Sequence, residues 1–402
     1  MKTLLQLNRR SFLQAAATSS LMLGSQRSWS AQAAETPSYI HGVSRTEAAK
    51  IKDQALNFMH EYKVPGLSLA MGYRGKLKLV MCVGYADHET GVLPQHRFRV
   101  ASVSKPLTSI LVMKLMEMNY WDLDQKVFGS GLLGYQDEIA TLGATNQRRL
   151  EAITLRHLLE HSCGGWGNQS RDPMFTGEAI DLDHDGLIRW VLKNRPLDHD
   201  PGQNYSYSNF GYCLLGRCIE KRFKMTYEDA FKAYVLRPHR MKNLGFEIGG
   251  NSVTDKRANE VTYYGQDEDA YHKVMNVTRM DAHGGWIATP TDLVRLMTYV
   301  DGFPTPSDLL NSSTIATMTS PSSVNPNYAK GWSVNKQHNW WHMGSFNGGA
   351  SVLARIHDQH LWAAMVNTRS KDPSFNTDLD GLPWKIKGSI RTWGGHDLFR
   401  QI

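Results

Sequence analysis

The distribution of apolar and polar positions in the first hundred residues predicts a helix followed by a β-hairpin. Ser44 and Glu47 have the spacing of a helix capping box, and the apolar residues that follow recur at helical intervals. Two apolar-rich runs, 67–73 and 77–85, flank a short turn around Gly75, which is typical of an antiparallel hairpin. We therefore expect a helix that packs against two paired strands.

The segment 98–119 predicts an extended run followed by an amphipathic helix. Ser102 opens this helix, and Pro106 lies one turn in, where the loss of a backbone N–H costs least. The apolar stripe of the helix is Val103, Leu107, Ile110, Leu111, Leu115 and Met118.

Between residues 121 and 280 strand signals become rare and helix signals dominate. Thr154 caps a short helix that extends to His161, and Thr289 with Pro290 forms a strong start for a later helix. The other expected helices are at 186–194, 210–222, 226–234 and 381–393. After the helix that starts at Thr289, the expected strands are at 331–334, 349–356 and 361–367.

Strands near both ends of the chain, with helices between them, imply one sheet that is assembled from distant segments. We expect an α+β fold in which an antiparallel sheet from the N- and C-terminal segments is flanked by helices. Because a chain of 402 residues exceeds the size that one core usually serves, we expect two lobes. An α/β lobe comprises 38–101 and 281–402, and an inserted, mainly helical lobe comprises 102–280.

The first 34 residues have the features of a twin-arginine signal peptide. Arg9 and Arg10 precede a short apolar stretch, and 31–33 form an A-x-A cleavage site. The apolar stretch is much shorter than the about 20 residues that span a bilayer as a helix. We expect export from a bacterial cytoplasm to the periplasm or beyond, a mature chain that starts near Ala34 or Glu35, and no stable transmembrane anchor. A basic amphipathic N-terminal helix is the alternative.

The charge of the chain argues against a nucleic-acid partner. The net charge is +7, but the first 34 residues contribute four basic and no acidic residues, so the remainder carries about +3. Nucleic-acid binding proteins concentrate a larger basic excess. The composition, 41% hydrophobic and 21% charged, is that of a globular protein. The four cysteines show no paired spacing, and we expect all four to be free and mostly buried.

Ser102 and Lys105 are the candidate nucleophile and its base. Residues three apart share a helix face, so the hydroxyl and the amine point into one cleft. The helix N-terminus favours a developing oxyanion, and a lysine that is desolvated beside the serine loses pKa and can take its proton. The same S-x-x-K pattern occurs at Ser333 and Lys336, but there in a short extended stretch. The alternative for Ser102 is an ordinary helix cap.

Tyr207 and Asn209 are candidate partners of this pair. They form the only Y-x-N of the chain, on a loop before the helix expected at 210–222. Tyr207 is suited to act as a general base or acid if the nearby Lys105 lowers its pKa. Asn209 is suited to bind a substrate carbonyl or to hold Lys105. The alternative is an ordinary polar turn.

His342 and Gly344 precede the strand expected at 349–356. A small residue there lets a substrate lie close to the sheet edge, and the backbone N–H of Ser345 is a candidate oxyanion donor beside that of Ser102. His283 also begins an H-x-G pattern, so this motif is weak by itself. His283 is kept as a candidate for the rim of the cleft.

The motifs Ser102-Val-Ser-Lys105, Tyr207-Ser-Asn209 and His342-Met-Gly344, in this order, resemble the three active-site motifs of serine β-lactamases and penicillin-binding proteins. The Y-x-N form is similar to the class C branch, which includes esterases, D-amino-acid peptidases and DD-peptidases. Weaker matches at 153–165, 201–220 and 284–297 extend the resemblance over nearly the whole chain after the leader.

This resemblance implies an exported serine hydrolase that is acylated on Ser102. Lys105 and Tyr207 then share proton transfer, Asn209 orients a small-molecule ester, amide or peptide, and His342 lies in the strand of the third motif. The family usually has a lysine at the position of His342, where its charge meets a substrate carboxylate. Because histidine is mostly neutral near pH 7, an esterase or peptidase is favoured over an efficient β-lactamase.

Two other functions stay open. One is a D-stereospecific peptidase or DD-carboxypeptidase that acts on cell-wall peptides, and the other is a non-catalytic relative that binds peptidoglycan. Cys163 replaces a serine that the resembled family often has, and nothing in the sequence explains this.

Two metal-like patterns are set aside, and we expect neither a metal nor a cofactor. His157 and His161 fit the H-x-x-E-H of zinc peptidases, but they fall in a stretch that the resembled family uses structurally. Asp181, Asp183 and Asp185 imitate the start of a calcium loop, but its twelfth position is Leu192 where a glutamate is needed.

Overall fold

The computed structural model describes residues 36–401 apart from 169–171, 240 and 242. The predicted leader, residues 1–34, lies outside the described residues. Residues 37–402 form one unit. Among the described residues, none of the helices has the length and apolar character needed to cross a membrane.

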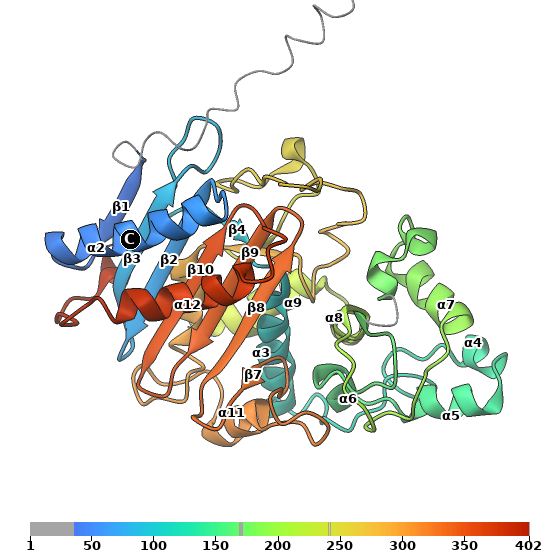
Figure 1. The fold of residues 1–402 in the computed structure, drawn as a ribbon. Coiled ribbons are helices and arrows are strands. Elements are labelled where there is room, and N and C mark those ends of the chain that lie inside the picture. Colours follow the sequence, from blue (N-terminus) through green and yellow to red (C-terminus); the bar gives the residue numbers. More distant parts are fainter. Residues whose placement is uncertain (1–35, 169–171, 240, 242, 402) are drawn as a thin grey trace, which may run out of the picture. The chain divides into compact units, whose positions relative to one another are not determined.

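A seven-stranded sheet, with every pairing antiparallel, is built from both ends of the chain (Figure 1). Its strands are β1 (Ser38–His41), β2 (Gly66–Tyr73), β3 (Lys76–Gly84), β7 (Ser333–Val334), β8 (Trp340–Phe346), β9 (Gly349–Arg355) and β10 (His360–Val366). The spatial order is β1-β3-β2-β10-β9-β8-β7. The pairing of Ala70 in β2 with Ala363 in β10 joins the two ends of the chain. The predicted α+β fold class is confirmed.

Two helices cover one face of this sheet, α2 (Arg45–Glu61) and α12 (Phe375–Lys387), as Figure 1 shows. The predicted capping box of Ser44 and Glu47 begins α2. The closing helix was expected at 381–393, but in the structure it is α12 and begins six residues earlier, at Phe375. Burial of its apolar side chains against the sheet, Phe375 among them, outweighs the backbone bond that Pro383 removes inside α12.

The helix α3 (Ser104–Glu117) lies on the other side of the sheet and follows the single turn η2 (Ala101–Val103). The prediction of an amphipathic helix is wrong, because α3 is buried on nearly all sides for its first ten residues. Its polar residues there make hydrogen bonds: Thr108 donates to the carbonyl of Ala282 at 2.5 Å. Met118, placed on the apolar stripe, is 42% exposed just after the helix.

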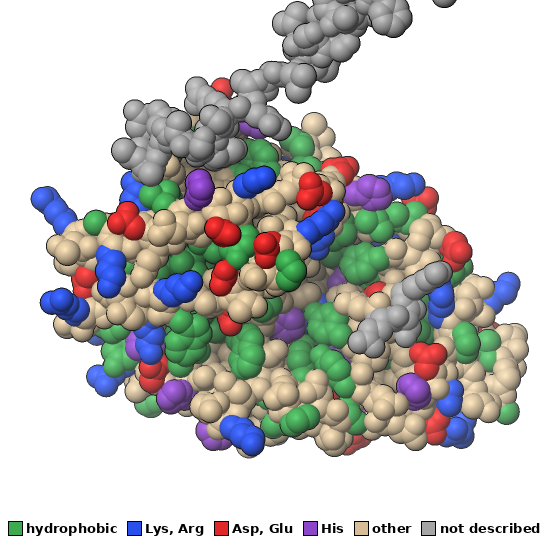
Figure 2. All heavy atoms as spheres, viewed as in Figure 1, with side chains coloured by type: hydrophobic (Ala, Val, Ile, Leu, Met, Phe, Trp, Pro, Cys, Tyr) green, Lys and Arg blue, Asp and Glu red, His purple; other side chains and the backbone are tan. Residues whose placement is uncertain are grey.

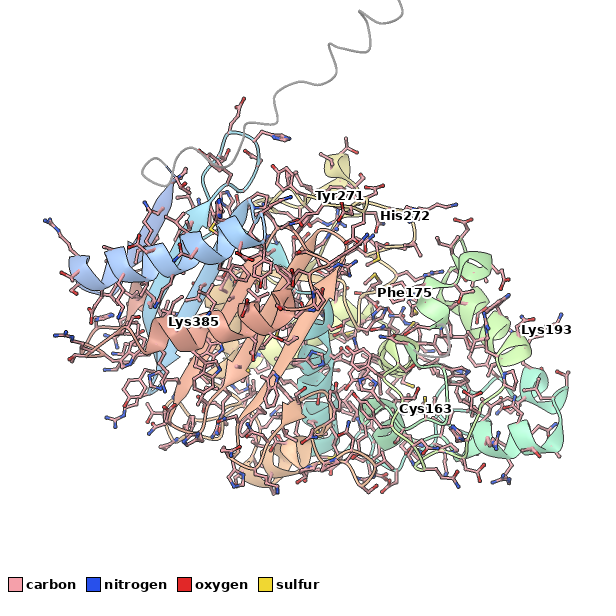
Figure 3. All side chains as sticks on the ribbon, in the orientation of Figure 1. Cys163, Phe175, Lys193, Tyr271, His272 and Lys385 are labelled. Carbon is pink, nitrogen blue, oxygen red and sulfur yellow. The ribbon has the colours of Figure 1, made fainter. Side chains whose placement is uncertain are left out.

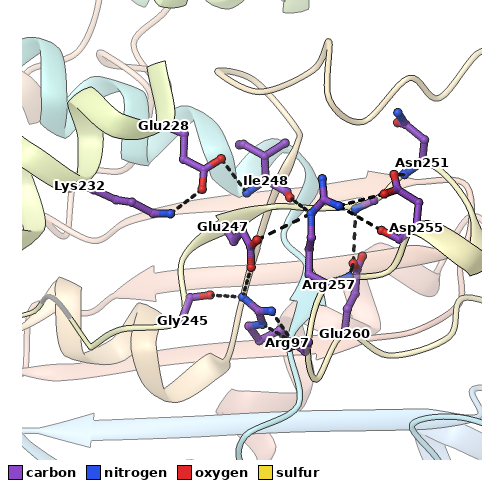
Figure 4. Close-up of polar contacts among 12 residues, drawn as sticks. Arg97, Glu228, Lys232, Gly245, Glu247, Ile248, Asn251, Asp255, Arg257 and Glu260 are labelled. Atoms are coloured by element: carbon purple, nitrogen blue, oxygen red, sulfur yellow. Dashed lines mark hydrogen bonds and ion pairs between the residues drawn. The ribbon is translucent and has the colours of Figure 1, made fainter. Parts of the chain in front are cut away.

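A second, three-stranded sheet fixes the approach to this turn. It has the order β4-β6-β5, with β4 (Phe98–Arg99), β5 (Glu247–Ile248) and β6 (Trp286–Ala288). Arg97 pairs with Glu247 at 2.7 Å, within the polar network that Figure 4 shows. The extended run predicted before Ser102 is therefore part of a sheet, and its end is held by the segments around it.

The remaining helices lie mainly between residues 136 and 240. They are α4 (Gln136–Ala140), α5 (Ala144–Ala152), α6 (Leu155–Leu159), α7 (His184–Asn194), α8 (Asn209–Phe223), α9 (Tyr227–Phe231), α10 (Pro290–Met297) and α11 (Ser312–Thr319). Single 3-10 turns occur at η4 (Pro173–Phe175), η5 (Gly177–Ala179), η7 (Arg237–His239), η8 (Val253–Asp255) and η9 (Leu398–Arg400), and η6 (Lys232–Leu236) is a π-helical turn. The predicted caps Thr154 and Thr289 are confirmed.

All four cysteines are buried and free, as expected. Cys163, which Figure 3 labels, donates a hydrogen bond to the carbonyl of Gly165 at 3.3 Å. On the face that Figure 2 shows, basic and acidic side chains are interspersed, in keeping with the small net charge predicted for this part of the chain.

Candidate active site

Ser102 lies in the turn η2, between β4 and α3, and its side chain is partly exposed to solvent. The residue before it, Ala101, has φ +47°, which is a strained conformation for a residue with a Cβ. The strand β8 packs directly against this turn at Gly344. A side chain on Gly344 would collide with the carbonyl oxygen of Val100. The missing side chain at Gly344 therefore leaves room for the backbone just before Ser102.

Lys105 is completely buried and donates hydrogen bonds to three acceptors. These are Oγ of Ser102 at 3.0 Å, Oδ1 of Asn209 at 2.7 Å and the carbonyl oxygen of His283 at 3.1 Å. Burial lowers the pKa of Lys105 to about 7, while the charge of Asp172 opposes this shift. About half of the amine is therefore neutral at pH 7 and able to take the proton of Ser102.

Tyr207 approaches the same serine from the loop before α8. Its phenol makes a hydrogen bond with Ser102, and Nζ of Lys105 lies 4.7 Å from the centre of its ring. The sequence analysis made the proton-transfer role of Tyr207 depend on a pKa lowered by Lys105. Burial instead raises the pKa of Tyr207, and Lys105 does not lower it. Tyr207 therefore stays a protonated phenol, and Lys105 is the better base.

Asn209, the first residue of α8, has its side-chain amide fixed by two oxygens. Its Nδ2 donates to Oδ1 of Asn168 at 3.1 Å and to Oδ2 of Asp172 at 3.0 Å, so its Oδ1 turns towards Lys105. The predicted role of holding Lys105 agrees with this geometry. The backbone N–H of Asn209 also donates to Asp172 at 2.9 Å.

Asp172 was missed by the sequence analysis. Its carboxyl group is buried, and burial raises its pKa to about 6. In the sequence it looks like an ordinary loop aspartate before Pro173, and it does cap that turn by accepting from the N–H of Met174 at 3.0 Å. Only the folded chain shows that its second oxygen orients Asn209.

His342 lies on β8, a strand that the resemblance implied and the hydrophobic pattern did not indicate. Its ring centre is 6.3 Å from that of Tyr207. Burial lowers the pKa of His342 to about 3, so the ring is neutral. Ser345 follows Gly344 on the same strand, and its side-chain hydroxyl is buried without a hydrogen-bond partner among the described residues.

His283 reaches the site through its backbone. Its carbonyl oxygen accepts from Lys105, whereas its ring is buried against the ring of Phe175, with 6.3 Å between centres. The candidate position of the His283 side chain at the cleft rim is therefore wrong. Phe175, labelled in Figure 3, comes from the turn η4.

The histidines of the zinc-like pattern have separate structural roles. Nδ1 of His157 accepts from the backbone N–H of Thr154 at 3.2 Å, which caps α6. His161 bonds instead to the hydroxyl of Tyr328 at 3.1 Å. Of the calcium-like aspartates, Asp183 caps α7 through the N–H of Gly186 at 2.8 Å. Asp185 accepts from the hydroxyl of Tyr135 at 2.8 Å.

A separate cavity of about 670 Å³ lies between α4, α7 and α8 and contains none of the groups around Ser102. Four of its charged side chains form ion pairs with one another: Arg217 pairs with Glu220 at 3.0 Å, and Arg189 with Asp185 at 2.8 Å. These groups are already neutralised by protein partners.

Taken together, a partly exposed serine hydroxyl, a buried amine of lowered pKa and a protonated phenol meet in one place. The nucleophile can lose its proton to Lys105, and Tyr207 can give a proton to a departing group. Within the α+β fold, this arrangement of groups is suited to the chemistry of a serine hydrolase.

The chain belongs to the β-lactamase family, because the model of the family described as Beta-lactamase matches residues 51–383. A putative fimbrial assembly protein FimD, serogroup D, of Dichelobacter nodosus is 31% identical over 219 residues, which are 53% of this chain and 52% of that protein. The chain thus spans about half the length of the curated relatives that it matches first.

Solved structures that share this fold include EstCE1 and a D-amino acid amidase. EstCE1, a hydrolase with promiscuous acyltransferase activity, aligns with a TM-score of 0.67 at 17% identity, over 86% of this chain and 99% of that one. The D-amino acid amidase of Ochrobactrum anthropi SV3, complexed with L-phenylalanine amide, aligns with a TM-score of 0.64 at 18% identity. That alignment covers 85% of this chain and 98% of the amidase.

Proposed function

We propose that this protein is a serine hydrolase that forms an acyl-enzyme on Ser102. One observation carries the proposal: the Ser102 oxygen accepts a hydrogen bond from Lys105, whose pKa is lowered to about 7, and is also bonded to the phenol of Tyr207. A non-catalytic binding protein has no use for a buried amine that is held half-neutral at the cost of its desolvation.

In the proposed reaction Ser102 gives its proton to Lys105 as its oxygen attacks the substrate carbonyl carbon. The negative charge that develops on the carbonyl oxygen is bound by the backbone N–H groups of Ser102 and Ser345. The bond to the leaving group then breaks, and Tyr207 protonates the leaving group while it regains a proton from Lys105. Water repeats these steps on the acyl-enzyme and releases the acid and Ser102.

The favoured substrates are small esters or amides. The fold similarity to EstCE1, a hydrolase with promiscuous acyltransferase activity, and to a D-amino acid amidase supports this class. The neutral His342 fits substrates without a carboxylate. The similarity to the amidase also supports the second candidate, a D-stereospecific peptidase of the class C branch. The Y-x-N form of the second motif supports the assignment to that branch.

We also propose export of this hydrolase by the twin-arginine route. The support comes from the leader sequence, with Arg9 and Arg10 before the apolar stretch. Cell fractionation of the wild type and of a variant in which Arg9 and Arg10 are both replaced by lysine tests it. Retention of the variant in the cytoplasm supports the route, and equal export of both forms refutes it.

Labelling with a fluorophosphonate probe tests the acyl-enzyme proposal. The wild type is expected to gain one covalent adduct on the peptide that contains Ser102, and Ser102→Ala is expected to gain none. Ser333→Ala is the matched control, because Ser333 has the same S-x-x-K pattern but lies on β7. An adduct that persists in Ser102→Ala, or no adduct in the wild type, would overturn the proposal.

A further inference from the structure

The positive charge of the chain after the leader is concentrated in one segment, residues 221–239. This segment contains five basic and two acidic residues, which gives it a net charge of +3. The whole chain after the leader also carries +3, from 45 basic residues less the four of the leader, against 38 acidic residues. The rest of that chain is therefore balanced, and attraction for an anionic partner is strongest around 221–239.

Three cations of this segment are exposed and form no ion pair among the residues that the structure describes. They are Arg222 in the last turn of α8, Lys224 just after that helix, and Arg237 in the turn η7. Lys232 differs from them, because it pairs with Glu228 at 2.5 Å. The three exposed charges are therefore available to a partner outside the chain.

Exposed aromatic and apolar side chains lie beside these cations. Met118 is 42% exposed and Tyr120 is 36% exposed, and both follow the end of α3. The ring centre of Tyr120 lies 4.9 Å from that of Phe223 and 6.3 Å from that of Tyr234. The guanidinium of Arg222 lies 6.0 Å from the centre of the Tyr120 ring. We call this surface the basic aromatic patch, with the cations Arg222, Lys224 and Arg237 and the rings of Tyr120, Phe223 and Tyr234.

The basic aromatic patch lies at the far end of the two helices that carry the candidate site. Near the start of α3, Lys105 bonds to Asn209, the first residue of α8, at 2.7 Å. Just after α3, Tyr120 contacts Phe223, the last residue of α8. The two helices therefore run side by side in the same direction, and their length places the patch about 20 Å from the site. A partner on the patch leaves the approach to Ser102 open.

Stabilisation of helix ends explains only part of this patch. Arg222 lies where a cation stabilises the negative end of α8. Lys224 lies beyond that last turn, and Arg237 belongs to a separate single turn. A helix end also has no need of the exposed Met118 and Tyr120 beside it, and exposed apolar side chains that are grouped mark interaction surfaces.

We propose that the basic aromatic patch binds the surface of a membrane that contains anionic phospholipids. Lys and Arg side chains bind the lipid phosphates, whereas Tyr, Phe and Met side chains enter the boundary between headgroups and acyl chains. A nucleic acid fits less well, because it calls for a larger basic excess than +3. The protein is then held peripherally, with Ser102 at the end remote from the bilayer. This inference does not depend on hydrolase activity.

Sedimentation with lipid vesicles tests this proposal. The chain is used without residues 1–34, whose four basic residues would bind vesicles by themselves, and residues 37–402 form one compact unit. One set of vesicles is pure phosphatidylcholine, and the other contains equal parts of phosphatidylcholine and phosphatidylglycerol. Three cations that each contribute about fivefold predict a partition constant about a hundredfold higher on the anionic vesicles. Raising the salt concentration from about 0.01 M to about 0.15 M shortens the Debye length and is expected to weaken this binding at least about tenfold.

Two variants ask whether the patch causes the binding. One combines Arg222→Gln, Lys224→Gln and Arg237→Gln, and it is expected to lose most of the preference for anionic vesicles. The other combines Met118→Ser with Tyr120→Ser. Because burial of apolar groups is not screened by salt, this second variant is expected to bind about tenfold more weakly at both salt concentrations.

The control variant combines Lys50→Gln, Lys63→Gln and Lys385→Gln. It removes the same charge from exposed positions on or just after α2 and on α12, across the seven-stranded sheet from α3. This variant is expected to bind anionic vesicles as the wild type does. All three variants are expected to keep the urea midpoint of the wild type, because the changed side chains are exposed.

Three results would overturn the proposal. The first is a wild type that binds both kinds of vesicle equally or binds neither, including the case in which the patch joins a second copy of the chain. The second is a variant without Arg222, Lys224 and Arg237 that still binds as the wild type does. The third is an equal loss in the control variant, which would show a general effect of charge. Failure of Ser102 labelling would refute the hydrolase and leave membrane binding standing.

Discussion

The variant Asp172→Asn tests whether Lys105 is the base that activates Ser102. Only the neutral amine can accept the serine proton, and the pKa of Lys105 is lowered to about 7. At pH 6 about one molecule in ten carries the neutral amine, and at pH 8 about nine in ten do. The wild-type kcat/KM for a p-nitrophenyl ester is therefore expected to rise about tenfold from pH 6 to pH 8.

The carboxylate of Asp172 opposes the lowered pKa of Lys105, because a nearby negative charge stabilises the ammonium form. Removing that charge is expected to lower the pKa of Lys105 further, so more of the amine is neutral at pH 6. The ratio of kcat/KM between pH 8 and pH 6 is then expected to shrink several-fold. The absolute rate is expected to fall, because Asn209 loses the acceptor that orients its amide.

The assay is the pH dependence of kcat/KM from pH 5 to 9 for the wild type, Asp172→Asn and the control Asp183→Asn. Asp183 caps α7 and has no hydrogen bond with Lys105, so its variant should keep the wild-type ratio. Asp172 itself has a pKa raised to about 6, so the apparent values belong to the pair, and the difference between variants is the measured quantity. An unchanged ratio in Asp172→Asn would refute the coupling.

Three further predictions concern the phenol, the glycine and the buried histidines. Tyr207→Phe is expected to reduce kcat by about 10²–10⁴ in steady-state assays, and unchanged turnover would remove Tyr207 from proton transfer. Gly344→Ala is expected to lower the free energy of unfolding by about 1–3 kcal/mol in urea denaturation, because its Cβ would collide with the Val100 carbonyl oxygen. A variant as stable as the wild type would contradict this. Burial lowers the pKa of His161 and His342, so below about pH 6.5 the unfolded chain binds protons that the folded protein does not. Stability is therefore expected to fall between pH 7 and pH 5, and an equal urea midpoint at both values would disprove this.

The elements that the sequence predicted well are those with local signals. The capping box of Ser44 and Glu47 and the cap at Thr154 depend on residues three apart, and the structure contains both. The hydrophobic pattern did not indicate β8, because its short run of aromatic and small residues has no turn signal before it, and only the family resemblance implied a strand there. The amphipathic pattern of α3 was misleading, since its polar side chains find partners from distant segments inside the core.

The residues of the candidate site also fall into those with a local sequence signal and those without one. Ser102, Lys105, Tyr207 and Asn209 were found from motifs, and the structure brings their side chains together. Asp172 has no local signal, because its importance comes only from the Asn209 side chain that the fold places beside it. Desolvation is likewise invisible in a linear sequence, which is why the direction of the Tyr207 pKa shift was not foreseen.

The central position of β10 has a consequence for how this molecule is made. β10 lies between β2 and β9, yet it leaves the ribosome long after β2, because it comes from residues 360–366 and β2 from residues 66–73. Until it emerges, the nascent chain exposes an unpaired edge of β2, which is a template for association with other chains. Completion of the sheet, and with it the support beneath Ser102, must therefore wait until residues 360–366 have been made. This delay favours a chaperone that shields the β2 edge in the meantime.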